Sequence, residues 1–398
     1  MDDAASMQMP PRSRRFPIFL GLLTIMAAAS ALWLIFLWHS GVNYQEQYSL
    51  QLASGSVHPV ATYGSPDDPM PLYYLLLSGF IHITVPSLDN ARLLSFICLL
   101  LTILVAYAVG KKMSDNRRVG LTAAALVGLS PFILWYNSRA TMYPLLLLVA
   151  LINQYLFVEL FKRARWWLWT GYIISGLAGL GVHYFFALIL ALQGVFAIIK
   201  HREFRGWKRV GLGLCLAVFA TAFVLWLHYS SAHTTYWSNL PYTSRPSATN
   251  AFIIYVQYLF GFQSVVITTL IIAFWPFLVI LSLLAVQKYV RPPVGVQYAV
   301  WAATAPVIIM LGLGWLVPRP LFLTSYLVVS ATPFLLFLSW YFTAFNLRSL
   351  TLARNIFLIA MVIAFFVQFA NIPIALREDY LRQPDSSNPA KLVTLPGS

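Results

Sequence analysis

Residues 71–85 read PLYYLLLSGFIHITV, an apolar run of fifteen residues that follows a polar segment. A helix of fifteen residues is about 22 Å long, which is shorter than the roughly 30 Å hydrocarbon core of a bilayer. Length alone does not decide whether this run crosses a membrane, because a thinned bilayer would admit it. The answer sets the topology of the whole chain, since one added crossing exchanges the two sides of every later loop.

The chain around this run has the composition of a membrane protein. Of its 398 residues, 60% are hydrophobic and 10% are charged, and the mean hydropathy is +0.74. Soluble domains carry about 25% charged residues, so a soluble globule is excluded. The apolar runs do not alternate with polar residues as barrel strands do. The fold class predicted is therefore an all-α polytopic membrane protein.

Basic residues and cysteines exclude several other classes. The net charge of +14 comes from short loops between apolar runs, which indicates membrane topology and not a nucleic-acid partner. Cys98 and Cys215 lie inside apolar runs, so no disulfide or zinc framework follows from them. The first apolar run, 16–38, is longer than the roughly 7–15-residue core of a signal peptide, which predicts a retained anchor.

Eleven segments are long and apolar enough to be predicted as membrane-spanning helices. They are approximately 17–38, 92–110, 119–136, 142–161, 166–183, 184–199, 209–229, 264–286, 296–316, 321–343 and 355–371. The shorter runs 71–85 and 251–262 are predicted as two short helices that lie on the outer surface.

The distribution of basic residues supports this assignment. With the N-terminus in the cytoplasm and both short runs on the outer surface, 19 of the 26 Lys and Arg residues face the cytoplasm. If 71–85 crossed alone, nearly all of that charge would move outside, against the positive-inside rule. The predicted location is a prokaryotic plasma membrane. The predicted parts are a cytoplasmic tail (1–16), a transmembrane domain (17–371) with larger outer loops at 39–91 and 230–263, and an outer C-terminal tail (372–398).

The first outer loop holds three of the twelve acidic residues, Glu46, Asp67 and Asp68. Glu46 lies near the start of a short amphipathic segment. It is either a general base at the membrane surface or a solvated acid at a helix N-terminus. Asp67 and Asp68 precede Pro69-Met70-Pro71. They either cap the next helix or orient an acceptor, directly or through a divalent metal.

Arg139, Arg245 and Arg319 lie at outer turns on a face otherwise poor in cations. They either reach lipid headgroups as interfacial anchors or bind a phosphate or pyrophosphate. His183, at a tight turn, is more typical of a capped turn than of a ligand. Trp237 is either an interfacial aromatic residue or a platform for a sugar ring.

Five segments follow one another in a characteristic order: NYQEQYS (43–49), DDPMPLYYLLLSGF (67–80), ARLLSFICLLLTILVAYAVGKKM (91–113), LSPFILWYNSRATMYPLLLL (129–148) and GLGVHYFFALILALQ (179–193). In this order they resemble the GT-C fold of integral-membrane glycosyltransferases, most of all bacterial relatives of the protein O-mannosyltransferases and the aminoarabinose transferases. A further stretch, TTYWSNLPYTSRPS (234–247), is similar to a loop before a second surface helix of that fold.

The resemblance implies a polyprenyl-phosphate sugar donor and a glycan, lipid or protein acceptor on the outer face. It adds Gln45, Tyr143, His183 and Tyr184 to Trp237 as candidates for binding the sugar or the acceptor. The chain also departs from the pattern. Gln45-Glu46 stands where the family has Asp-Glu, and Arg139-Ala140-Thr141 stands where it has Glu-Ala-Arg. Either the site has been rebuilt with relocated charges, or this chain has lost activity.

The leading hypothesis is a membrane glycosyltransferase. Glu46 would take the proton of the acceptor hydroxyl, and Asp67 or Asp68 would orient the acceptor or a metal. Arg139, with Arg319 and Arg245, would stabilise charge on the departing lipid phosphate. The alternatives are an inactive GT-C-like scaffold subunit and a lipid-linked sugar translocase. The latter is disfavoured because the middles of the predicted spans contain no Asp, Glu, Lys or Arg.

Overall fold

The computed structural model describes most of the chain, and its regular structure there is helical. The described residues are 16–39, 44–55, 71–204, 206–231, 245–264, 266–269, 271, 292–317, 322–344 and 348–370. Within those ranges every regular element is an α-helix or a 3-10 helix, with no strand. The prediction of an all-α protein is confirmed.

Six of the described helices are long and apolar enough to cross a membrane. They are α1 (Phe16–His39), α4 (Leu88–Ser114), α7 (Tyr143–Lys162), α10 (Trp207–Ser231), α14 (Val294–Leu316) and α16 (Arg348–Ala370). A bent pair formed by α5 (Arg117–Leu129) and α6 (Pro131–Asn137) adds a seventh if it is taken as one span. The chain is therefore a multi-pass membrane protein.

The other described helices are shorter. They are α2 (Tyr44–Ala53), α3 (Pro71–Ile83), α8 (Trp166–Val182), α9 (Phe186–Ile199), α12 (Ala248–Phe260), η2 (Val328–Ser330) and α15 (Ala331–Ala344). Ten of the eleven segments predicted to span coincide with helices, and the remaining one, 264–286, lies largely outside the described residues. The total of about eleven spans stays a prediction, as do the boundaries of the outer loops and tails.

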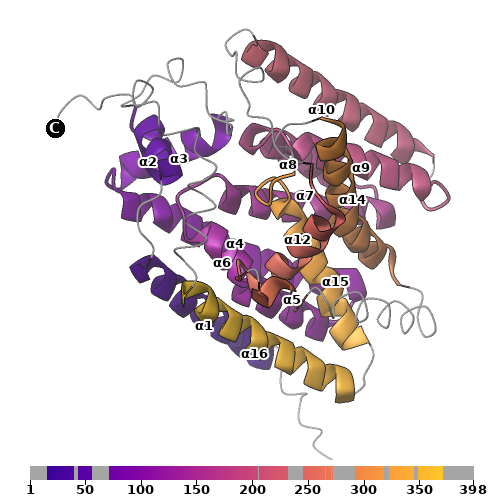
Figure 1. The fold of residues 1–398 in the computed structure, drawn as a ribbon. Helices are drawn as coiled ribbons and strands as arrows, with labels where there is room; N and C mark the ends of the chain where they lie inside the picture. The colour runs from indigo at the N-terminus through magenta and orange to yellow at the C-terminus, as the bar shows by residue number, and fades with distance from the viewer. Residues whose placement is uncertain are drawn as a thin grey trace, which may run out of the picture.

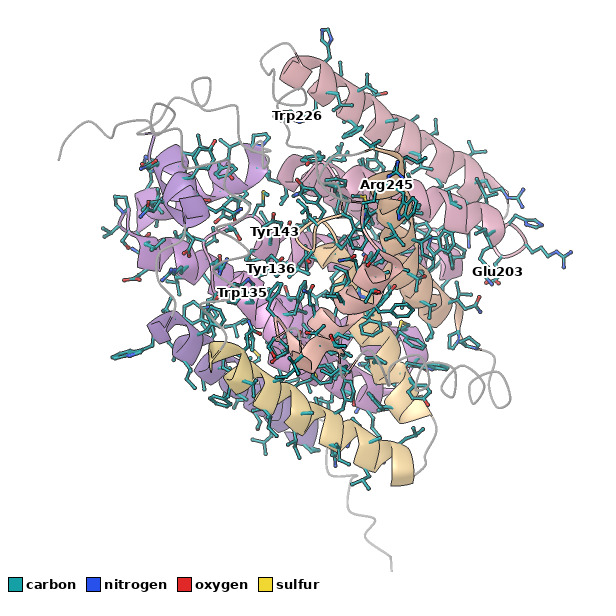
Figure 2. All side chains as sticks on the ribbon, viewed as in Figure 1. Trp135, Tyr136, Tyr143, Glu203, Trp226 and Arg245 are labelled. Carbon is teal, nitrogen blue, oxygen red and sulfur yellow. The ribbon has the colours of Figure 1, made fainter. Side chains whose placement is uncertain are left out.

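The bundle has a buried centre and lipid-facing edges. Figure 1 shows α1 and α16 side by side along one edge and α10 along the opposite edge. In each of these three helices, 17% of the most apolar window is buried, compared with 72% in α7 at the centre. Side chains from all the helices fill the space between the ribbons (Figure 2). The exposed apolar edges are the surfaces that lipid chains would cover.

Two glycines let α4 and α5 pack closely. A Cβ atom on Gly120 would lie 2.7 Å from the carbonyl oxygen of Tyr107, and one on Gly110 would lie 2.9 Å from the Cβ of Ala123. Small residues at such contacts allow helix backbones to approach, which is how helices associate in lipid, where the hydrophobic effect does not drive them together. The close contact fixes α5 against the helix that carries Arg92 and Lys112 at its two ends.

The segment 119–136, predicted as one span, is broken. The axes of α5 and α6 differ by 60° at Ser130. Pro131 lacks a backbone N–H and begins α6, while the Ser130 hydroxyl accepts a hydrogen bond from the N–H of Ile133 and donates one to the carbonyl of Tyr258 at 2.8 Å. At the end of α6, the carbonyl of Asn137 accepts a 2.9 Å hydrogen bond from the Trp33 indole of α1. Helix α6 ends at Asn137, two residues before Arg139.

Helix α3 forms within the run 71–85, and it is amphipathic. Tyr73, Leu77 and Ile81 are buried on one face, while Leu75 and Ile83 are 65% and 87% exposed. At thirteen residues, α3 is about 20 Å long, too short to cross an ordinary bilayer. The prediction of a short helix is confirmed here and for α12, whereas their position on the outer surface stays a prediction.

Helix α4 defines two ends of the molecule. Arg92 lies near its start and Lys112 near its finish, twenty residues or about 30 Å apart along the axis. Tyr143 and Lys162 mark the same two ends on α7. We refer to the Glu46 end, which holds Glu46, Arg92 and Tyr143, and to the Lys112 end, which holds Lys112 and Lys162.

Candidate functional site

Glu46 lies in the first turn of α2 and is buried. The predicted short helix is present from Tyr44 to Ala53, and the Glu46 side chain is only 1% exposed. Its placement therefore differs from that of a solvated acid at a helix N-terminus. A buried carboxylate needs compensating donors, because its transfer from water is otherwise very costly.

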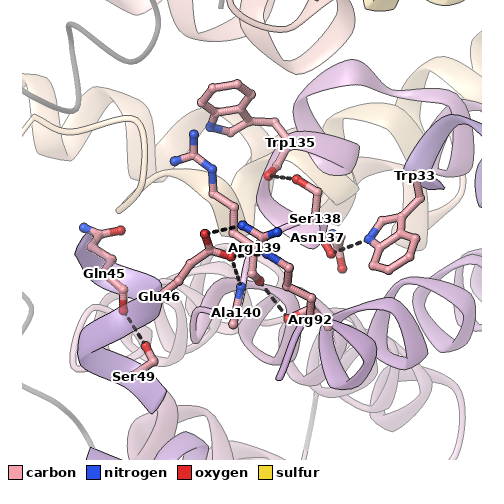
Figure 3. Close-up of polar contacts among 11 residues, drawn as sticks. Trp33, Gln45, Glu46, Ser49, Arg92, Trp135, Asn137, Ser138, Arg139 and Ala140 are labelled. Atoms are coloured by element: carbon pink, nitrogen blue, oxygen red, sulfur yellow. Dashed lines mark hydrogen bonds and ion pairs between the residues drawn. The ribbon is translucent and has the colours of Figure 1, made fainter. Parts of the chain in front are cut away.

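Arg92 and the backbone supply those donors. The Nε and one terminal nitrogen of Arg92 donate to the two carboxylate oxygens of Glu46, each at 2.7 Å (Figure 3). The backbone N–H of Ala140 donates to the same carboxylate at 3.0 Å. Such a two-bond contact between a guanidinium and a carboxylate is the strongest form of side-chain ion pair. It joins α2, α4 and the link between α6 and α7 at one point.

Arg92 is a functional candidate that no sequence motif indicates. The sequence gives a weak signal for Arg92, because it is a lone cation near the start of a long apolar helix. In the structure it is 5% exposed. Residues of this kind in membrane helices usually have a specific partner.

Arg139 lies directly beside this ion pair. It precedes Ala140, and its backbone carbonyl accepts a 2.8 Å hydrogen bond from Ser95 of α4. Its guanidinium carbon lies 3.9 Å from the ring centroid of Trp135, a close cation–π contact, and the residue is 8% exposed. The structure thus brings the predicted base, Glu46, and the predicted phosphate ligand, Arg139, to the same junction (Figure 3).

A row of aromatic side chains continues from this junction. Tyr136 and Tyr143 meet edge to face at 5.1 Å, and Tyr143 lies 6.1 Å from the His183 ring. His183 stacks on Tyr184 at 4.9 Å. Figure 2 shows Trp135, Tyr136 and Tyr143 following one another through the middle of the bundle. The predicted sugar-binding or acceptor-binding residues Tyr143, His183 and Tyr184 therefore lie together.

The two ring nitrogens of His183 differ in their contacts: Nδ1 makes a hydrogen bond within the turn, and Nε2 makes none with the described residues. Its Nδ1 accepts a 3.1 Å hydrogen bond from the N–H of Phe185, which confirms a capped turn. An acceptor at Nδ1 places the proton of the neutral ring on Nε2. Nε2 is buried and has no hydrogen-bond partner among the described residues. It is therefore a donor that a hydroxyl or carbonyl oxygen of a ligand would satisfy.

Tyr73 of α3 is a second candidate that no sequence pattern indicates. It is 1% exposed, and its ring meets that of Tyr74 at 5.2 Å. Burial raises the pKa of the Tyr73 phenol well above its usual value, with a smaller contribution from the nearby Glu46 carboxylate. The phenol consequently stays protonated and keeps a hydrogen-bond donor close to Glu46.

The remaining predicted residues lie elsewhere or outside the described part. Gln45 is exposed on α2 beside Glu46, and its carbonyl accepts from Ser49 at 2.8 Å. Arg245 lies 5.4 Å from the Trp315 ring, and the Trp315 indole donates to Pro246 at 2.8 Å, so Arg245 is held at the end of α14. Asp67, Asp68, Trp237 and Arg319 fall outside the described residues.

The divalent-metal site predicted at Asp67 and Asp68 stays a prediction. Among the residues that the structure describes, no three His, Cys, Asp or Glu side chains gather as metal ligands. That statement does not cover Asp67 and Asp68, the two carboxylates for which a metal was considered.

One family model and two solved structures are similar to this chain. Residues 66–229 match the family model described as dolichyl-phosphate-mannose-protein mannosyltransferase. The crystal structure of ArnT from Cupriavidus metallidurans in the apo state aligns with a TM-score of 0.58 at 14% identity, over 84% of this chain and 62% of that one. The structure of ArnT from the same organism bound to undecaprenyl phosphate aligns with a TM-score of 0.56 at 15% identity, over 89% of this chain and 71% of that one.

The chain has a GT-C fold, as its sequence resemblance predicts. It spans about 62% of the apo ArnT chain that it matches, so that protein has parts without a counterpart here. A search of curated proteins found no match.

Proposed function

We propose that this protein is a GT-C glycosyltransferase that moves a monosaccharide from a polyprenyl-phosphate carrier to an acceptor on the outer face of a prokaryotic plasma membrane. The observation that carries the proposal is the buried junction of Glu46, Arg92 and Arg139 at one end of the bundle. Charged groups inside a membrane protein are costly and mark sites of function. The match to an ArnT structure with bound undecaprenyl phosphate supports a lipid of that class as donor.

Arg139 would bind the phosphate of the carrier. The N–H groups of a guanidinium lie in its plane, so an arginine can stack its face on a ring while its edge binds phosphate oxygens. Trp135, at 3.9 Å, would hold the Arg139 guanidinium in place. When the sugar leaves the carrier, negative charge grows on the phosphate, and a fixed cation stabilises that charge most in a site from which water is excluded. Arg319 would add a second cation.

Glu46 would receive the proton of the acceptor hydroxyl. Its two oxygens already accept hydrogen bonds from Arg92 and Ala140, which fixes the carboxylate in one orientation. A fixed base needs no reorganisation when the hydroxyl arrives. Asp67 or Asp68 would orient the acceptor, directly or through a divalent metal. Tyr143, His183 and Tyr184 would line the sugar, with Gln45 and Trp237 at its edge.

The same contacts also fit a second candidate function, that of an inactive GT-C-like scaffold subunit. The Glu46 carboxylate is engaged by three donors, and an arginine stands at position 139, where the resembling family carries a glutamate. Both observations suit a structural ion pair as well as a catalytic one. A translocase has no comparable support.

Sugar transfer by the purified protein separates these functions. With a polyprenyl-phosphate-linked sugar and a cell-envelope extract as acceptor source, the wild-type chain should release polyprenyl phosphate and glycosylate the extract. Glu46→Gln should lower turnover by roughly 10²–10⁴-fold, the usual contribution of a positioned general base. Gln47→Ala, at an exposed position on the same helix, serves as the matched control. Full turnover in Glu46→Gln would refute the mechanism, and lipid binding without transfer by wild type would favour the scaffold.

The orientation has its own test. Gln45→Cys, exposed at the Glu46 end, should react with a membrane-impermeant maleimide added to intact cells. Glu203→Cys, exposed in the basic loop between α9 and α10, should react only after lysis. The two native cysteines, Cys98 and Cys215, are buried and give little background. Reaction of position 45 only from the cytosol would overturn transfer on the outer face.

A further inference from the structure

The aromatic ring that lies against the Arg139 guanidinium is itself packed between two other rings. The centroid of the Trp135 ring, on α6, lies 3.9 Å from the guanidinium carbon (Figure 3). Phe36 of α1 meets the Trp135 ring edge to face at 5.3 Å, and the ring of Phe262, which follows α12, lies 5.3 Å from it. Trp135 is 4% exposed. The position of the Arg139 charge therefore depends on contacts that α1 and the turn after α12 make with Trp135.

The turn that carries Phe262 is tightly packed. Helix α12 ends at Phe260, and Gly261 follows with a φ of 70°. A residue with a side chain is disfavoured at this φ, whereas glycine adopts it readily. A Cβ atom on Gly261 would also overlap the side-chain amide of Gln368 in α16, and it would lie 2.9 Å from the Cβ of Pro131 in α6. The turn therefore fits closely between α16 and the beginning of α6.

Two amide side chains hold this turn against α16. The Gln368 Oε1 accepts a hydrogen bond from the backbone N–H of Phe262 at 3.3 Å. The Gln263 Nε2 donates one to the carbonyl of Ala364, about one helical turn earlier on α16, at 2.9 Å. Gln368 is only 2% exposed, and a buried amide in an apolar helix is costly without such a partner. These contacts fix the backbone of Phe262.

The ring of Phe262 covers one face of α6. Besides Trp135, it lies 5.8 Å from the ring of Phe132 and 6.3 Å from that of Tyr136. Positions 132, 135 and 136 are three and four residues apart, so they share a face of the helix. Loss of the Phe262 ring would let the Trp135 ring rotate, and the guanidinium would move with it. A displacement of about 1 Å at a reacting group can cost up to about 10²-fold in rate.

We propose that Phe262 is a positioning residue for the Arg139 guanidinium and that it acts through Trp135. The inference rests on the proposed function, in which Arg139 binds the phosphate of the donor. Phe262 takes no part in the chemistry. It restricts the orientation of the Trp135 ring, so that the edge of the guanidinium faces the phosphate oxygens before the donor arrives.

A double-mutant cycle between Phe262 and Trp135 tests this, with kcat/KM for a polyprenyl-phosphate-linked sugar as the readout. Phe262→Leu removes the ring but keeps an apolar side chain, and it should lower kcat/KM about fivefold, compared with about tenfold for Trp135→Leu. Because Phe262 acts through Trp135, the double variant should also lose only about tenfold. Independent residues would lose about fiftyfold, and that result would overturn the proposal.

Phe260→Leu is the matched control. It removes the same kind of ring two residues earlier, where Phe260 lies 5.4 Å from the ring of Phe357 in α16. It should change kcat/KM by less than about twofold, and Phe262→Tyr, which keeps the ring, should do the same. Equal losses in Phe260→Leu and Phe262→Leu would show that both residues act through general packing, which contradicts a positioning role.

Gln368→Leu reaches the same turn by another route and guards against misfolding of the Phe262 variant. It leaves every ring in place and removes the acceptor of the Phe262 N–H. It should lower kcat/KM about threefold in the wild-type background and less than about twofold when Phe262 is already leucine. A full threefold loss in both backgrounds would mean that α16 affects activity independently of Phe262.

Equilibrium binding of polyprenyl phosphate to the purified protein separates this inference from the proposed function. If the wild type binds the lipid but transfers no sugar, sugar transfer fails, and the same cycle measured on Kd decides the positioning role. If the wild type transfers sugar and the cycle is additive, only the positioning role fails. If the wild type does not bind the lipid, both proposals fail.

Discussion

Replacing Arg92 with methionine should destabilise the protein by roughly 3–5 kcal/mol, the usual effect of breaking a buried ion pair. The change removes the partner that makes two 2.7 Å hydrogen bonds to the Glu46 carboxylate, while that carboxylate stays only 1% exposed. Denaturant unfolding of the purified protein in mixed micelles measures the effect. Arg118→Met, at an exposed site on the Lys112 end, should change stability by no more than about 0.5 kcal/mol.

The double variant Arg92→Met with Glu46→Leu distinguishes structure from catalysis. A buried ion pair replaced by apolar residues of similar volume is often neutral, so the double variant should recover most of the stability that either single change removes. It should nevertheless have no sugar transfer, because the proposed base is gone. If the two losses simply add, the residues act independently, and the ion pair is not the link that joins α2 to α4.

Replacing Arg139 with methionine should lower kcat/KM for a polyprenyl-phosphate-sugar donor by roughly 10²–10³-fold, the typical effect of removing one group that stabilises transition-state charge. Arg139→Lys should recover part of this, because an ammonium keeps the charge but not the two-bonded contact. Trp135→Leu, which removes the ring 3.9 Å from the guanidinium, should cost about tenfold, whereas Trp135→Phe should cost less.

Arg245 supplies the matched control for Arg139. It too lies over an indole, that of Trp315, but at 5.4 Å and in an exposed position at the end of α14. Arg245→Met should therefore change kcat/KM by less than about threefold if its ring contact is a surface interaction. Equal losses in the two variants would mean that the phosphate site is shared, and an unaffected Arg139→Met would remove Arg139 from the mechanism.

Hydropathy predicted the helices well because membrane spans are set by local composition. The run 142–161 and the helix α7 (Tyr143–Lys162) agree almost to the residue. The break at Ser130 was missed for a physical reason. The residues on both sides of the Ser130-Pro131 step are apolar, so the window stays hydrophobic through the bend, and only that step indicates it. The hydrogen bond from Ser130 to Tyr258, 128 positions later, cannot be anticipated from sequence.

The candidate site was predictable only in part. Glu46 was predicted as an acid of the first outer loop, Arg139 as a cation at an outer turn, and Tyr143 because its segment resembles a known fold. The structure places the three near one another. The contact between Glu46 and Arg92 joins positions 46 residues apart, and nothing local in either segment indicates that they meet. The sequence alone was compatible with a solvated Glu46. The structure shows that Glu46 is buried, so its charge requires a partner.

The hydrogen bond from Trp33 to the carbonyl of Asn137 has a consequence for biosynthesis. Its two residues are 104 positions apart, so the first helix enters the lipid long before its partner in α6 has been made. At about 5–20 residues per second, the ribosome needs roughly 5–20 s to reach that partner. Only 17% of the apolar window of α1 is buried in the folded bundle, and the mean hydropathy of that window is 2.3. Helix α1 is therefore apolar enough to be stable in the bilayer before its partner is made. The contact between α1 and α6 can thus form only after the nascent chain has passed the bend at Ser130.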